Sequence, residues 1–124
     1  MNYLKSSLFV LLFFTLNNLY ADTLTIMHYN LMYYDKNVYG CTSETNNVDS
    51  KDGYLRTIIN FVKPDIFTVN ELNTSTASSE RIKTNVLNIN GETKYLRANT
   101  SGSYISNMIY YNSEKLVLKS QAEV

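Results

Sequence analysis

The segment DGYLRTIINFVKPDIFTVNEL, residues 52–72, constrains the fold more than any other part of this sequence. The apolar residues of its first half recur at the spacing of one helical face: Leu55, Ile58, Ile59 and Val62. This spacing predicts an amphipathic helix, with three polar residues as possible caps: Asp49, Ser50 and Asp52. Pro64 cannot continue a helix, and it keeps Lys63 out of the helical conformation. Because β-prone residues follow at once, the segment predicts a helix, a short turn and a buried strand.

An earlier strand is predicted at LTIMHYNL, residues 24–31. Its alternation places one set of side chains on one face, Leu24, Ile26, His28 and Asn30, and a second set on the other, Thr25, Met27 and Tyr29. Strand, helix and strand form a right-handed βαβ unit with two parallel strands. The stretch between strand and helix, residues 32–53, is polar and irregular, and a loop of this length is often functional.

The rest of the sequence predicts one more helix and three more strands. The helix covers SSERIKTNVLNI, with Ser78 or Ser79 as its cap and Asn90-Gly91 at its end. We expect three residues on its inner face: Ile82, Val86 and Ile89. TKYLRAN and YISNMIYYN predict two hairpin strands around TSGS, and KLVLKS predicts the start of a further strand. The predicted fold class is therefore α/β.

The first residues have the pattern of a secretory signal peptide. Lys5 precedes an apolar run, LFVLLFFTL, and a small residue, Ala21, follows a short polar stretch. A transmembrane helix needs about 20 apolar residues, so we expect no stable membrane span. The predicted organisation is a signal peptide at 1–21 and a domain at 22–124, with a secreted, periplasmic or extracellular location.

Charge and cysteine content restrict the possible partners. Eleven basic and eleven acidic residues cancel, so no cationic field attracts nucleic acid or membranes non-specifically. Recognition of a phosphate would be local, through a metal ion or a few side chains. Cys41, the single cysteine, is either free or paired with a cysteine outside this sequence. The favoured interpretation is a small, partly buried residue.

Polar side chains follow both strands of the predicted βαβ unit. Asn30 ends the first strand and Glu71 ends the second. Because parallel strands end at the same edge of a sheet, where α/β folds bind ligands, the two side chains should meet. An amide oxygen and a carboxylate suit a hard cation such as Mg²⁺. The alternative is a strand that simply leaves the core for solvent, with Glu71 hydrated.

These residues resemble a known family. LTIMHYNL followed by LRTIINFVKPDIFTVNEL looks like the opening of the endonuclease/exonuclease/phosphatase (DNase I-like) superfamily, and SNMIYYNSEKLVL resembles its later pair of strands. The resemblance implies a metal-dependent phosphoesterase with a two-sheet, four-layer α/β sandwich. It also implies that Glu71 ligates Mg²⁺ or Mn²⁺ and that Asn30 helps to hold metal and phosphate, so both are catalytic and metal-site candidates. Asn70 stands where that family usually has Gln.

The resemblance covers only the N-terminal half of that fold. The general base, the phosphate-binding histidine and the later aspartates of the family have no counterpart here. His28 matches no catalytic position and is interpreted as a packed or hydrogen-bonded strand residue. We therefore expect a truncated sandwich, inactive alone, that exposes one sheet edge and one apolar face.

The expected function is that of a secreted metal-dependent phosphoester hydrolase. Its substrate could be a nucleic acid, a phospholipid headgroup or a sugar phosphate, and no protein partner is inferred. One alternative is a non-catalytic secreted α/β binding module or a degenerate relative. Another is a gene fragment whose product does not fold.

Overall fold

The computed structural model describes residues 23–99 and 102–122, so the predicted signal peptide at 1–21 lies outside the described residues. The elements follow in this order: β1 (Ile26–Tyr34), α2 (Val48–Val62), β2 (Ile66–Leu72), α3 (Thr76–Ile82), the π-helix η1 (Lys83–Leu87), β3 (Tyr95–Arg97) and β4 (Ser106–Asn112). No helix in the described part of the chain is long and apolar enough to cross a membrane. The fold is a mixed α/β structure.

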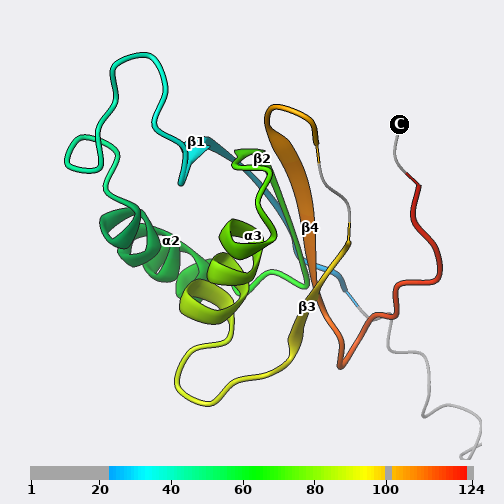
Figure 1. Ribbon diagram of the computed structural model, residues 1–124. Coiled ribbons are helices and arrows are strands. Elements are labelled where there is room, and N and C mark those ends of the chain that lie inside the picture. Colours follow the sequence, from blue (N-terminus) through cyan, green and yellow to red (C-terminus); the bar gives the residue numbers. More distant parts are fainter. Residues whose placement is uncertain (1–22, 100–101, 123–124) are drawn as a thin grey trace, which may run out of the picture.

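The strands form one four-stranded sheet in the order β1-β2-β4-β3. β1 and β2 are parallel and are joined through α2, as predicted, whereas β4 pairs antiparallel with both β2 and β3. Figure 1 shows α2 and α3 on the same face of this sheet. The other face carries no element of the described chain, and β1 and β3 form the two edges.

Helix α2 begins earlier than the sequence predicts. Its N-cap is Asn47, whose side chain accepts a hydrogen bond of 2.8 Å from the Ser50 N–H, so the three predicted caps were wrong. The helix ends at Val62, and Lys63 is non-helical as predicted: it adopts a left-handed conformation with φ 50° before Pro64. The Lys63 N–H donates to the Ile59 carbonyl at 2.7 Å and closes the last turn.

The second helical segment also begins before its predicted start. Ser75 is the N-cap, and its hydroxyl accepts from the Ser78 N–H at 3.1 Å. Ser78 and Ser79, the predicted caps, are buried within the helix instead. After Ile82 the helix widens into the π-helix η1, which keeps Val86 and Leu87 buried.

The core lies between the sheet and the helices. Phe67 of β2 and Tyr110 of β4 stack with ring centroids 5.9 Å apart, and both side chains are fully buried. Leu55 and Ile59 of α2 and Ile82 of α3 belong to the same apolar cluster.

The β3–β4 hairpin was predicted correctly, but KLVLKS forms no strand: these residues follow β4 without regular structure, and Val117 is exposed.

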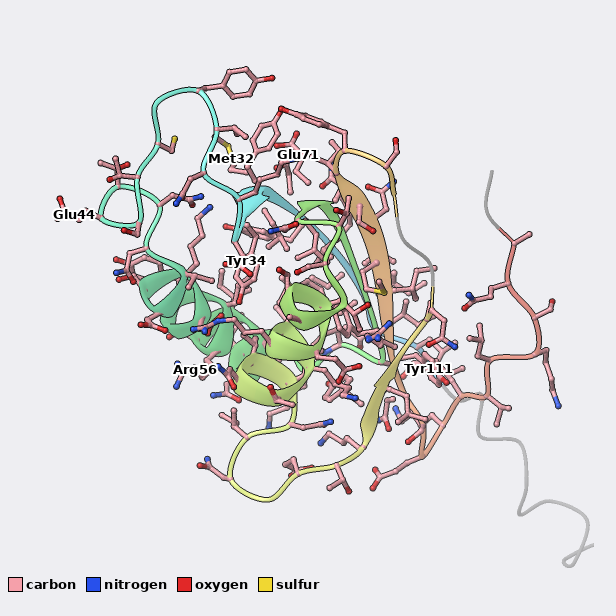
Figure 2. All side chains as sticks on the ribbon, viewed as in Figure 1. Met32, Tyr34, Glu44, Arg56, Glu71 and Tyr111 are labelled. Atoms are coloured by element: carbon pink, nitrogen blue, oxygen red, sulfur yellow. The ribbon has the colours of Figure 1, made fainter. Side chains whose placement is uncertain are left out.

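The uncovered face of the sheet carries an apolar row. Its members are brought into register across all four strands: Ile26, Ile66, Tyr111 and Leu96. Ile26 is 66% exposed and Leu96 is 44% exposed. Figure 2 shows Tyr111 on the side of the sheet away from the helices. An exposed apolar face was expected from the sequence.

Candidate metal-binding site at the strand tips

Asn30 and Glu71 meet at the carboxyl ends of β1 and β2. The Asn30 amide nitrogen donates a hydrogen bond of 2.8 Å to a Glu71 carboxylate oxygen. The Asn30 amide oxygen accepts from the Met32 N–H, also at 2.8 Å. In Figure 2, Met32 and Glu71 lie close to each other at the same end of the sheet. The structure therefore brings together the two residues that the sequence singles out.

A break in the strand alternation makes this pair possible. Phe67 and Val69 face the core, so strict alternation would turn Glu71 toward the helices as well. Instead, Glu71 adopts a left-handed conformation with φ 57°, and the β2–β4 register shifts between Val69 and Leu72. A non-glycine residue in this conformation costs about 1–3 kcal/mol, and such strain is concentrated at functional sites. The bulge turns the carboxylate of Glu71 toward Asn30 and leaves Leu72 in the core.

β1 has a matching irregularity beside Asn30. Met32 and Tyr33 have φ values of 48° and 58°, and the β1–β2 register shifts between Asn30 and Tyr34. Lys51 of α2 holds this kink, because its ammonium group donates to the carbonyls of Leu31 and Met32, each at 3.0 Å. Burial lowers the pKa of Lys51. The backbone around Asn30 is thus fixed from the helix side.

Asn70 adds an unsatisfied acceptor next to the pair. It is opposite Asn30 in the strand register. Its amide oxygen is buried and has no hydrogen-bond partner among the described residues. Buried polar atoms almost always have a partner, so this oxygen needs one that the described side chains and backbone do not supply, such as a bound water or a cation. The sequence drew attention to Asn70 only as a departure from the family pattern.

His28 lies on the same face of β1 but has a different role. Its Nδ1 atom is 2.8 Å from the Thr68 hydroxyl on β2. It links the two parallel strands two residues before Asn30, which agrees with its interpretation as a hydrogen-bonded strand residue.

The donor set fits a hard cation that keeps most of its own water. The described residues contain no group of three or more His, Cys, Asp or Glu side chains placed to hold a metal. At this edge Glu71 supplies a carboxylate and Asn70 an unpartnered amide oxygen, while the Asn30 amide oxygen already accepts the Met32 N–H. Mg²⁺ is commonly bound by one or two carboxylates together with water and substrate phosphate. These residues therefore fit an open Mg²⁺ or Mn²⁺ site.

A tyrosine cluster lies near Glu71, at the end of β1 and on the loop that follows it. Tyr33 and Tyr39 contact each other edge to face with centroids 5.4 Å apart, and the Lys36 ammonium group lies 3.5 Å from the ring centroid of Tyr104. A side-chain hydrogen bond with Tyr39, with smaller effects from burial and from nearby charges that include Glu71, raises the pKa of Tyr33 to about 12. Tyr104 lies too far along the chain for any local pattern to link it to this loop.

Two further polar features lie elsewhere. Cys41 is exposed, not partly buried as predicted, and is unpaired within the described residues.

Between the sheet and the helices, the Tyr34 hydroxyl donates to Asp52, and Arg81 pairs with Asp52 at 2.7 Å. Burial and the Asp52 hydrogen bond raise the pKa of Tyr34. The two buried members, Tyr34 and Asp52, tie β1 to α2, and the Arg81 side chain, 28% exposed, joins them from α3.

No family model, curated protein or solved structure matches this chain.

Proposed function

We propose that this chain provides the metal-binding part of a secreted, Mg²⁺- or Mn²⁺-dependent phosphoester hydrolase. The observation that carries the proposal is the 2.8 Å hydrogen bond between Asn30 and Glu71, formed by residues at the ends of two parallel strands. The unsatisfied oxygen of Asn70 supports it, because this acceptor lies beside the pair.

Each residue has a distinct task in this proposal. Glu71 supplies the negative charge that attracts the cation, and Asn30 fixes the orientation of that carboxylate through its amide group. A bound cation at such a site supplies Lewis acidity toward a phosphoryl oxygen. The Asn30 oxygen already accepts the Met32 N–H and keeps one lone pair for the cation or for water.

The finer proposal for the fold is the first half of a DNase I-like, two-sheet sandwich. The uncovered apolar row supports it, since Ile26 and Leu96 are 66% and 44% exposed on a face where a second sheet would pack. In this arrangement a second half provides the base that activates water. His28, which bonds to Thr68, is not that base.

The test uses the full-length protein as its host exports it. It measures metal binding and phosphodiester hydrolysis. Glu71→Gln keeps the shape of the side chain and removes its charge. We expect at least tenfold weaker Mn²⁺ binding by calorimetry and a matching loss of bis(p-nitrophenyl) phosphate hydrolysis, because hard cations depend on carboxylate charge.

Glu44→Gln is the matched control. Glu44 is an exposed carboxylate on the loop between β1 and α2, away from Glu71 in Figure 2. It should bind Mn²⁺ and hydrolyse the diester like the parent protein. Equal behaviour of the two variants would overturn the proposal.

A second candidate is a non-catalytic secreted binding module. The same apolar row favours it, because exposed apolar patches often mark interaction surfaces. Under this function Glu71→Gln would leave all properties unchanged, and Ile26→Asp, in the row, would abolish binding of a protein partner.

A further inference from the structure

Three tyrosines, two of them exposed, gather with one lysine near the Asn30–Glu71 pair. This tyrosine cluster consists of Tyr33, Tyr39, Tyr104 and Lys36. Tyr39 is 80% exposed and Tyr104 is 52% exposed. Proteins of this size seldom leave such rings together in water unless they bind something.

Part of the tyrosine cluster lies next to the candidate metal site in the sheet. Tyr33 follows Asn30 by three residues in β1. The register of the parallel strands places Tyr34, which follows Tyr33, opposite Leu72, which follows Glu71. A ligand with its phosphate near Glu71 can therefore place another part against these rings.

The rings are held in position before any ligand arrives. The Lys36 N–H donates to the Tyr33 carbonyl at 3.0 Å, and the Lys36 ammonium group bonds to the Tyr104 carbonyl while it lies 3.5 Å from that ring's centroid. Tyr33 and Tyr39 both have left-handed backbone conformations, with φ 58° and 54°. A preorganised surface loses less conformational entropy on binding than a mobile loop.

We propose that the tyrosine cluster stacks on a base of single-stranded nucleic acid whose phosphate lies at the Asn30–Glu71 pair. This inference rests on the proposed function and names its substrate class. Aromatic side chains stack on any base, whereas a choline cation, which aromatic rings also bind, would face the Lys36 ammonium group that already lies over the Tyr104 ring. Because positive and negative residues cancel in this chain, base contacts must contribute much of the affinity, which favours strands with unpaired bases.

The test compares two fluorescein-labelled oligodeoxynucleotides of equal length, one of mixed sequence and one with abasic sites throughout its centre. Fluorescence anisotropy with the full chain in EDTA gives both affinities without metal. We expect about tenfold tighter binding of the intact strand, in the range of one stacked base. Tyr39→Ala should remove this preference and leave binding of the abasic strand unchanged.

Two variants separate stacking from folding defects. Tyr39→Phe keeps the ring and should keep the preference for intact bases. Phe61→Ala removes another exposed ring, 89% exposed near the end of α2, and should also keep it. Circular dichroism checks that each variant is folded.

The outcomes distinguish this inference from the proposed function. Equal affinity for the two strands, or Tyr39-dependent binding to phosphatidylcholine vesicles with none to DNA, would overturn the inference, whatever the metal assays show. A preference for intact bases with no metal-dependent hydrolysis would support the base-binding site and overturn the hydrolase.

Discussion

β1 contacts two carboxylates that occupy very different environments. On the helix side, the Asp52 side chain is 1% exposed, receives the hydroxyl of Tyr34 and pairs with Arg81 at 2.7 Å. At the strand tip, Glu71 is half-buried and receives one side-chain donor, the amide of Asn30 at 2.8 Å. The residues that contact these two carboxylates, Tyr34 and Asn30, both belong to β1.

In the proposed function, this difference lets one strand serve stability at one residue and ligand binding at another. The charge of Asp52 is neutralised by protein, so the site is complete without a ligand. Glu71 carries its charge next to amides and an unsatisfied oxygen on Asn70, on a backbone that is strained there. We therefore expect changes at Asp52 to affect folding and changes at Glu71 to affect binding.

The largest effect is expected for Asp52→Ala. Removal of this carboxylate leaves Arg81 without its buried partner and Tyr34 without an acceptor. Loss of one member of a buried ion pair typically costs about 3–5 kcal/mol. Urea unfolding of the variant should show this loss in the free energy of unfolding.

Asp49→Ala is the matched control, since Asp49 also pairs with Arg81 but its side chain is 83% exposed. Exposed ion pairs contribute about 1 kcal/mol or less. A similar cost for both variants would mean that Asp52 is not the buried anchor described above.

Tyr34→Phe should have the next largest effect. The variant keeps the fully buried ring but removes the hydroxyl that donates to Asp52. An unsatisfied buried acceptor costs about 1–3 kcal/mol. The control is Tyr54→Phe, at a tyrosine on α2 that is 70% exposed. Thermal unfolding should show a larger loss of stability for Tyr34→Phe than for this control. Equal stability of the two variants would show that Asp52 does not need this donor.

Local patterns predicted much of this fold. The stripe around Leu55 and Ile59 indicated the helix, Pro64 marked its end, and alternation located the strands. The start of α2 was misplaced because Asn47, a good cap, lies in a polar stretch where several residues were equally plausible. KLVLKS has strand propensity, but a strand forms only with a partner, and the described residues give it none.

The sequence also predicted part of the candidate site. Parallel strands bring their ends together, which placed Asn30 beside Glu71. The role of Asp52 was missed, because a polar residue at the start of a helix looks like a cap. Its burial depends on Arg81, almost thirty residues further along the chain, and on Tyr34. Long-range partners of this kind leave no local signal, and the same holds for Tyr104 in the tyrosine cluster.

Asn30→Asp tests the strand-tip side of the comparison. It places a second carboxylate against Glu71, and adjacent like charges on a sheet destabilise it by about 0.2–1 kcal/mol. If this edge binds Mg²⁺, the ion should reverse that loss, since a ligand at ~10 mM with a dissociation constant of about 1 mM stabilises by about 1.4 kcal/mol.

Urea unfolding of Asn30→Asp in EDTA measures the loss in the free energy of unfolding, and urea unfolding in Mg²⁺ measures how far the ion reverses it. The parent protein and Asn30→Ala provide the controls, and the second carboxylate should give the variant the larger Mg²⁺ response. Destabilisation that Mg²⁺ does not relieve would argue against a cation site at this edge.

The smallest effect concerns Asp65, at the opposite end of β2 from Glu71. Its carboxylate accepts the Thr25 N–H at 3.0 Å and pairs with Lys115 at 3.0 Å. The Thr25 hydrogen bond, followed by that of Lys115, lowers the pKa of Asp65 below its ordinary value of 3.8. A carboxyl group whose pKa is lower in the folded state stabilises the fold above its unfolded pKa. This contribution disappears as the pH falls from about 4 through the lowered folded pKa.

Asp65→Asn should therefore reduce stability at neutral pH and flatten its loss in acid. Stability measured by urea unfolding at a series of pH values from neutral to about pH 2 tests this against the parent protein. Some acid sensitivity should persist, because Lys83 and Arg97 also lower the pKa of Glu80. An unchanged acid slope would show that Asp65 is not held by its neighbours. The contrast between a satisfied carboxylate at one end of β2 and an available one at the other would then fail.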